Sequence, residues 1–351
     1  MQILPCLLAV ISSVLPEKSG TVSIPAQEWP LKPGPRNIDV HVYYPGKDQS
    51  VRGITPETGL MLSLHNWGGK GFTGTADPTF LADHYNVVVI GVDYLESGPW
   101  AEQAPYPYDY GWLQALDALR ALSFVYRGLV SEGVPFAKDR IFVTGGSGGG
   151  NVTLMANKLA PNTFAVAVDL CGMKRLTNDV AYSLPGGTEM NARYSQDPTS
   201  PYYLTPDAQE LRYLGEPGQL AQMKAQGCAA KIVTVHGTKD EMCLYADAEE
   251  YAANMSKSGL DFTFVPVTED MVDQVAYRST GHALGVHALI VDRVAGEYLD
   301  PHSAKARRLT GPNNFKLGKE IRYATSGGTW IVDYSQEWPV GRVEARAAEK
   351  K

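Results

Sequence analysis

Ser147 lies in a segment whose glycine spacing suits a nucleophile. In IFVTGGSGGGN, Gly145 and Gly149 stand two residues to either side of Ser147, between a predicted strand and a predicted helix. Small residues at these positions let the backbone turn sharply, so that the serine hydroxyl is exposed and a carbonyl group can approach it. The helix adds positive potential, and the Gly148 N–H points to where an oxyanion would form. This pattern favours acyl transfer over a phosphate loop, because neither the phosphate-loop spacing nor a dinucleotide-binding glycine spacing fits as well.

A serine hydroxyl is a weak nucleophile by itself, so a base and an orienting acid must follow it in the chain. Asp240 comes directly after a predicted strand, in the segment HGTKDEMC, and Glu241 is the alternative acid. His282, in the segment STGHALG, stands in a loop between a predicted strand and a predicted helix. The chain order therefore predicts a catalytic triad of Ser147, Asp240 and His282, for which no metal or organic cofactor is needed.

The loop His65-Asn66-Trp67-Gly68-Gly69 follows an early predicted strand and is expected to complete the oxyanion hole. A backbone N–H of this turn, that of Trp67 in the first place, would donate to the oxyanion together with the Gly148 N–H. The Asn66 side chain is a second donor, and the sequence leaves the choice between Asn66 and Trp67 open. A tight turn that only packs against Ser147 is the simpler alternative.

Aromatic residues and prolines are dense between positions 94 and 112. Rings with polar tips suit the recognition of a sugar or aryl group, although they also serve to seal a loop onto the body of a protein. The predicted substrate-binding residues are Trp67, Tyr94, Trp100 and Tyr108. Arg193, which lies in a later insertion, is added because a guanidinium can bind a substrate carboxylate.

Alternating strands and helices are needed to position these residues. Short β-branched runs between turn residues predict strands at 37–44, 59–65, 86–92, 140–144, 165–170, 231–236 and 261–267. Apolar residues at three- and four-residue spacing predict helices at 111–129, 149–160, 244–258 and 285–298. The alternation is typical of an α/β fold, with a mostly parallel sheet between two layers of helices.

Two stretches interrupt the alternation. Residues 172–226 are too long for a simple connection and predict a lid insertion. Residues 301–351 form a C-terminal extension, in which two alternating runs around Ser326-Gly327-Gly328 predict a hairpin. The last ten residues, 342–351, are expected to be a solvated tail.

Composition excludes several functional classes. The 351 residues include 31 Lys and Arg against 38 Asp and Glu, and this net charge of −7 argues against a nucleic-acid or anionic-membrane surface. No apolar run reaches the roughly 18 residues of a transmembrane helix. Residues 1–20 contain an apolar stretch that is either a signal peptide, which would send a bacterial protein to the periplasm or outside the cell, or a segment that packs on a cytoplasmic protein.

Four cysteines, Cys6, Cys171, Cys228 and Cys243, stand without any C-x-x-C spacing. Their pattern supports neither a structural zinc nor a thioredoxin-type site. If the chain is exported, Cys228 and Cys243 could pair.

These segments together resemble the α/β-hydrolase superfamily over residues 37–300. The GTKD and GH loops look like the prolyl oligopeptidase and acetyl esterase branch. The segments YDYGWLQALDAL, GGSGGGN and NARYSQDPTSPYYLTPDAQE are similar to a bacterial family of unknown function. The resemblance implies an α/β-hydrolase domain at 21–300 and serine chemistry, with no established substrate, and Asn66-Trp67 departs from the small residues that are usual in this turn.

The sequence thus predicts a serine esterase that works through an acyl-enzyme. An acylated carbohydrate or a similar small ester is the expected substrate, because of the aromatic loops and the insertion. Two alternatives remain: a small serine peptidase of the prolyl oligopeptidase type, and a binding module that keeps the fold without catalysis.

Overall fold

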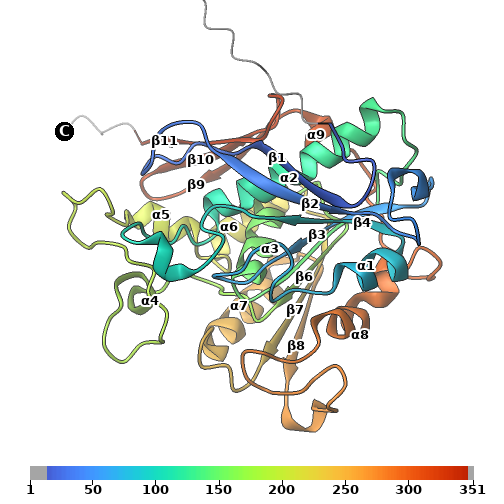
Figure 1. The fold of residues 1–351 in the computed structure, drawn as a ribbon. Coiled ribbons are helices and arrows are strands. Elements are labelled where there is room, and N and C mark those ends of the chain that lie inside the picture. The colour runs from blue at the N-terminus through green and yellow to red at the C-terminus, as the bar shows by residue number, and fades with distance from the viewer. Residues whose placement is uncertain (1–13, 347–351) are drawn as a thin grey trace, which may run out of the picture.

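The computed structural model describes residues 14–346, and most of the predicted signal segment, with Cys6, lies outside the described residues. An eight-stranded sheet forms the centre, in the order β1-β2-β4-β3-β5-β6-β7-β8 (Figure 1). Its strands are β1 (Gly20–Pro25), β2 (Asn37–Tyr43), β3 (Gly59–Leu64), β4 (Val87–Val92), β5 (Ile141–Gly146), β6 (Val166–Leu170), β7 (Lys231–Gly237) and β8 (Phe262–Val267). The β1–β2 and β2–β4 pairs are antiparallel, and the other pairs are parallel.

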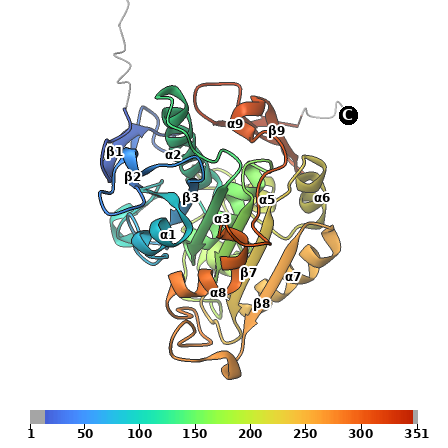
Figure 2. The ribbon, with the colours of Figure 1, turned by 90° about the vertical axis from the view of Figure 1, so that its right-hand side faces the viewer.

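The central strands are apolar on both faces because helices cover both. Every residue of β3 to β7 is buried, whereas β2 alternates between buried and more exposed positions. One face carries α2 (Trp112–Ser131), α3 (Gly148–Leu159) and α7 (Tyr245–Ser258), and the other carries α1 (Pro78–Tyr85) and α8 (His287–Leu299) (Figure 2). A separate apolar cluster lies on each side of the sheet.

The segment between β6 and β7 contains α4 (Asn178–Tyr182), α5 (Pro206–Leu211) and α6 (Pro217–Ala225). It is anchored to the loop that precedes α2. The buried Arg212 guanidinium lies 3.1 Å from the Asp109 carboxylate and also donates to the Asp109 carbonyl oxygen. The Tyr108 N–H donates to the Ala192 carbonyl oxygen at 2.9 Å. The predicted insertion is therefore held against the aromatic loop by buried polar contacts.

The C-terminal residues form α9 (Asn314–Leu317) and a second, three-stranded sheet of β9 (Glu320–Ala324), β10 (Gly328–Asp333) and β11 (Val340–Ala345). The predicted hairpin is confirmed, because β9 and β10 pair in antiparallel register. The expected solvated tail 342–351 was wrong for residues 342–345, which pair with β10 as part of β11 although most of them are exposed, and residues 347–351 lie outside the described residues. The small sheet contacts α2 beside β1, where Trp330 meets Trp112 edge to face (Figure 1).

All seven predicted strands and all four predicted helices are confirmed, with shifts of one or two residues at their ends. The sequence pattern did not predict the edge strand β1, the short helices α1, α4, α5, α6 and α9, or the 3-10 turns η1 (Val51–Gly53), η2 (Trp100–Gln103) and η3 (Glu269–Met271). The suggested Cys228–Cys243 pair was wrong, because both thiols are free. None of the helices in residues 14–346 is long and apolar enough to span a membrane.

Candidate active site

Ser147 occupies the sharp turn between β5 and α3. Its backbone has φ 55° and ψ −119°, a strained conformation that aims the side chain away from the sheet. Two glycines make the turn sterically feasible. A Cβ on Gly145 would lie 2.4 Å from the Gly149 carbonyl oxygen, and one on Gly149 would lie 2.1 Å from the Leu64 carbonyl oxygen. The predicted glycine spacing is therefore a packing requirement of this turn.

The structure brings Ser147, His282 and Asp240 together from three separate loops. His282 Nε2 lies 2.8 Å from Ser147 Oγ, and its Nδ1 lies 2.9 Å from Asp240 Oδ2. Asp240 is buried, whereas 22% of the His282 side chain is exposed. Glu241, the alternative acid, is exposed and has no bond to the histidine. This is the geometry in which an imidazole can take a proton from a serine while a carboxylate holds its tautomer.

Asp240 is kept ionised by its neighbours. Its Oδ1 accepts the Met242 and Cys243 N–H groups at 3.0 Å, and its Oδ2 lies 3.3 Å from His236 Nε2. Burial raises the pKa of Asp240, but the hydrogen bonds and charges of His236 and His282 lower it by more, so the net pKa lies well below the usual range. The role of His236 was not predicted, although its place four residues before Asp240 at a strand end was a usable signal.

The backbone N–H groups of Gly148 and Trp67, the two expected oxyanion donors, come from segments that pack closely together. A Cβ on Gly148 would lie only 2.7 Å from Trp67 N, which shows how closely the turn after β3 approaches the start of α3. Neither N–H donates to a protein acceptor within residues 14–346. The Asn66 side chain is packed against Gly69 and Gly74 inside its own turn. The arrangement favours Trp67 over Asn66 as the second donor.

We expect Gly148→Ala to lower kcat by about 10²- to 10³-fold, the usual cost of one oxyanion donor. The new methyl group would push Trp67 N away, while alanine itself suits the first turn of a helix. Steady-state ester hydrolysis measures the effect, and Gly311→Ala is the control, because a Cβ there meets nothing within 4 Å. A Gly148→Ala enzyme with unchanged kcat would show that this contact does not hold the oxyanion.

His65 anchors the turn that carries Trp67. Its Nδ1 lies 2.7 Å from the Asn66 carbonyl oxygen, its Nε2 lies 2.6 Å from Ser97 Oγ, and its ring stacks on Tyr94 at 3.9 Å. Burial lowers the pKa of His65 to about 4, although its bond to the Asn66 carbonyl opposes the shift. The histidine is therefore neutral in the folded protein at neutral pH.

Acid should lower the free energy of unfolding, because His65 binds a proton more readily in the unfolded chain than in the folded protein. The folded-state pKa lies below the unfolded value of 6.5, so this contribution is fully present above pH 6.5 and is lost as the pH falls towards 4. We expect a loss of about 2 kcal/mol in the free energy of unfolding by pH 5. Urea unfolding at several pH values measures it, and His65→Gln should show a flatter pH dependence. Equal slopes in the two proteins would contradict the assignment.

The predicted substrate-binding residues separate into two groups. Trp67, Trp100 and Tyr108 form one cluster: Trp67 stacks on Tyr108 at 3.8 Å and meets Trp100 edge to face at 5.1 Å. The Arg193 guanidinium lies over the Trp100 ring at 3.6 Å. Tyr94, which stacks on His65, and Tyr108 are both buried, so Trp67 and Trp100 are the predicted rings that are exposed enough to meet a substrate.

A cavity of about 660 Å³ opens beside the nucleophile, and none of the residues of this cluster lines it. Ser147 and His282 line it together with Asn66, Phe72, the start of α1 and the start of α8. One of its walls is His287, whose pKa is lowered by burial. His287 falls within the predicted helix 285–298, but its link with the site follows only from the fold, which brings α1 and α8 together. Among residues 14–346, the side chains grouped closely enough to share a metal ion are Cys171, Asp240 and His282.

Comparisons with known proteins concern the family and the fold of this chain. The model of the prolyl oligopeptidase family matches residues 122–298. Among solved structures, the acylaminoacyl peptidase of Pyrococcus horikoshii matches 80% of this chain and 41% of its own, with a TM-score of 0.53 and 12% identity. An acylaminoacyl peptidase in complex with Z-Gly-Gly-Phe-chloromethyl ketone matches 79% and 41%, with a TM-score of 0.51 and 13% identity.

This chain thus spans about two fifths of the length of these structures, and the likeness concerns the fold. No protein among the curated ones matches the sequence. With the observed sheet order, the comparisons confirm the predicted α/β-hydrolase fold and its prolyl oligopeptidase-like branch.

Proposed function

We propose that this chain, which belongs to the prolyl oligopeptidase family of serine hydrolases, hydrolyses carboxylic esters through an acyl-enzyme, with acylated carbohydrates as preferred substrates. The observation that carries the proposal is the hydrogen-bonded series Ser147–His282–Asp240 next to two free backbone N–H groups. A module that only binds a ligand has no need of this arrangement, which argues against the non-catalytic alternative.

In the proposed reaction, Ser147 Oγ attacks the ester carbonyl carbon while His282 Nε2 takes the serine proton. The resulting imidazolium is stabilised through Nδ1–H by Asp240, and the N–H groups of Gly148 and Trp67 bind the oxyanion. The tetrahedral intermediate collapses, and His282 returns the proton to the departing alcohol. Water then attacks the acyl-enzyme by the same route, which releases the acid and restores Ser147.

The carbohydrate preference is supported by polar atoms around the Trp67–Trp100–Tyr108 cluster. Several buried side-chain atoms have no partner in the described part of the chain: Trp67 Nε1, Glu96 Oε1, Gln103 Oε1 and Arg193 Nη1. The set contains both donors and acceptors beside aromatic rings. Sugar hydroxyls both donate and accept hydrogen bonds, and sugar rings pack on aromatic faces. We place the sugar part of the substrate here, under the insertion 172–226, which we propose to act as a lid.

The peptidase alternative is favoured by the family itself and is tested in the same assay. Purified protein is given p-nitrophenyl acetate, p-nitrophenyl butyrate, an acetylated xylo-oligosaccharide and an aminoacyl p-nitroanilide, and kcat/KM is measured for each. The proposal expects acetate release from the oligosaccharide with a higher kcat/KM than for the anilide. A higher kcat/KM for the anilide would replace the esterase assignment with a peptidase.

Trp100→Ala should raise KM for the acetylated oligosaccharide by about 3- to 10-fold, the usual value of one aromatic contact. Its kcat/KM for p-nitrophenyl acetate should stay unchanged, because that substrate has no sugar to stack. Phe80→Ala is the matched control, since Phe80 lies on α1 and stacks on His84, outside the Trp100 cluster. A parallel loss on both substrates would indicate structural damage rather than a lost sugar contact.

A further inference from the structure

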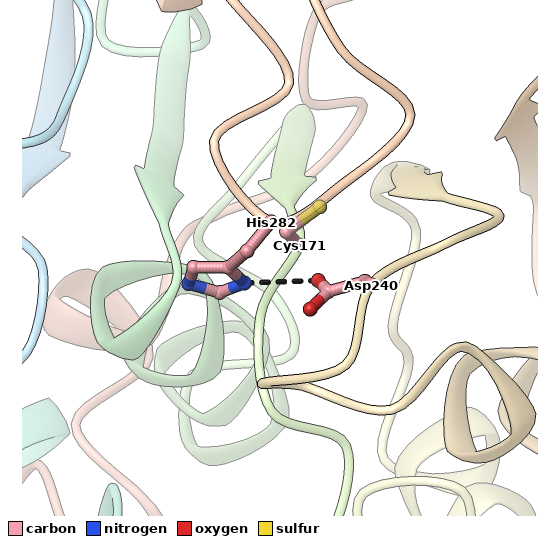
Figure 3. Close-up of side chains that lie close together, drawn as sticks. All are labelled: Cys171, Asp240 and His282. Carbon is pink, nitrogen blue, oxygen red and sulfur yellow. Dashed lines mark hydrogen bonds and ion pairs between the residues drawn. The ribbon is translucent and has the colours of Figure 1, made fainter. Parts of the chain in front are cut away.

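Cys171, Asp240 and His282 meet at the carboxyl edge of the sheet. Cys171 follows β6, Asp240 follows β7 and His282 precedes α8. One ligand atom from each lies within 4.8 Å of the other two. Figure 3 shows the His282 ring turned with Nδ1 towards Asp240, and the Cys171 thiol beside the pair. Cys171 and Asp240 are buried, whereas His282 is part exposed.

We propose that these three side chains form an inhibitory site for a thiophilic divalent cation such as Zn²⁺. Thiolate, imidazole and carboxylate are the ligands that zinc prefers, and three protein ligands with a water molecule complete a tetrahedral site. Ligand atoms in such a site lie about 3.3 to 3.8 Å apart, so a modest rotation of the side chains closes it. Magnesium, which prefers oxygen ligands, would not bind here.

Protons and charge balance in this step. The Cys171 Sγ–H bond breaks, its proton goes to solvent, and an Sγ–Zn bond forms. A thiolate, the Asp240 carboxylate and a neutral imidazole together with Zn²⁺ make a neutral complex, which a buried site tolerates better than a charged one. Of the three ligands, His282 alone lines the 660 Å³ cavity, so an ion from that cavity would have to enter past its ring.

Bound zinc would stop the reaction by fixing the wrong tautomer of His282. In the resting site, Nδ1–H faces Asp240, so that Nε2 can accept the Ser147 proton. A metal on Nδ1 uses its lone pair and moves the ring proton to Nε2. Nε2 then donates to Ser147 instead of accepting from it, so the nucleophile is no longer activated.

Binding is tested on the Ser147→Ala protein, so the result does not depend on the proposed esterase function. Co²⁺ is added, and the thiolate-to-cobalt charge-transfer absorption is recorded. Zn²⁺ affinity is then measured by displacement of the cobalt. The expected result is one metal per chain with this absorption, lost in Cys171→Ser and retained in Cys228→Ser, which removes a free thiol outside the site. Zinc affinity should fall by at least about 10-fold in Cys171→Ser.

Inhibition is tested on the active enzyme with the same cysteine variants. Zn²⁺ should inhibit ester hydrolysis and fluorophosphonate labelling of Ser147, EDTA should reverse both effects, and Cys171→Ser should need at least about 10-fold more zinc. Equal inhibition of wild type and Cys171→Ser, or equal inhibition by Mg²⁺, would overturn the proposal. The proposal would also be overturned if the cobalt complex of the Ser147→Ala protein showed no thiolate absorption, or if that absorption were lost on adding Cys243→Ser and kept on adding Cys171→Ser.

Discussion

Replacing Ser147 with alanine should lower ester turnover by about 10⁴-fold or more, because the nucleophile of a triad cannot be replaced by its neighbours. The change removes only Oγ, the atom that lies 2.8 Å from His282 Nε2, and the strained backbone of the turn is unchanged. We therefore expect the thermal stability of the variant to match or exceed that of wild type, since strained active sites often cost stability. Hydrolysis of p-nitrophenyl acetate and butyrate measures the loss of activity.

Covalent labelling separates loss of the nucleophile from loss of the fold. A fluorophosphonate should label wild type at Ser147, as mapped by mass spectrometry, and should not label Ser147→Ala. Ser131→Ala is the matched control, because Ser131 is exposed at the end of α2 and should keep full activity and labelling. Turnover that persists in Ser147→Ala, or a label on another serine of the wild type, would disprove the nucleophile assignment.

The sequence was sufficient for the residues whose roles depend on local patterns. The glycines around Ser147 are required by contacts below 3 Å at one turn, so their spacing is visible in eleven consecutive residues. Asp240 follows the buried strand β7, and His282 comes after the apolar, half-buried strand β8, and such apolar strands are easy to recognise. Because parallel strands end at the same edge of the sheet, residues in these loops converge although 42 positions separate them.

Contacts that depend on which strands are neighbours in the sheet could not be predicted from local sequence patterns. Cys171 lies beside Asp240 because β6 pairs with β7, so that the Cys171 N–H donates to the Val235 carbonyl oxygen. The sequence around Cys171 contains no pattern that predicts the pairing of β6 with β7. The same holds for His287 and α1, which share one cavity wall only after α1 and α8 pack on the same face.

The edge strand β11 illustrates a second limit. Its residues are half-buried or exposed, so the alternation that marks a half-buried strand is absent. Backbone pairing with β10 holds it, together with ion pairs that join Arg322 and Arg342 to Glu320 and Glu344. Charged residues on an edge strand are usual, since they discourage pairing with other chains. The hydrophobic pattern alone therefore predicts a solvent-exposed tail, and not a strand, for such a segment.

Asp240→Asn should lower kcat by about 10⁴-fold with little change in KM, and the surroundings of the carboxylate give the reason. Oδ1 accepts two backbone N–H groups, from Met242 and Cys243, so the amide oxygen of the asparagine must take that place. The NH₂ group then replaces Oδ2 and faces His282 Nδ1. An amide NH₂ cannot accept a hydrogen bond. The imidazole must carry its proton on Nε2 instead, and it can no longer take the proton of Ser147.

The same substitution should disturb His236, because its Nε2 lies 3.3 Å from Oδ2 and would meet the new NH₂ group. His236 Nε2 keeps its bond to the Cys243 carbonyl oxygen at 2.6 Å, which supports the loop and keeps the variant folded. Glu241→Gln is the matched control: this neighbouring acid is exposed, so the variant should retain wild-type kcat. Burst kinetics with p-nitrophenyl butyrate should place the Asp240→Asn defect in acylation. If Asp240→Asn kept kcat within about 10-fold of wild type, or if Glu241→Gln lost activity, another acid would orient the histidine.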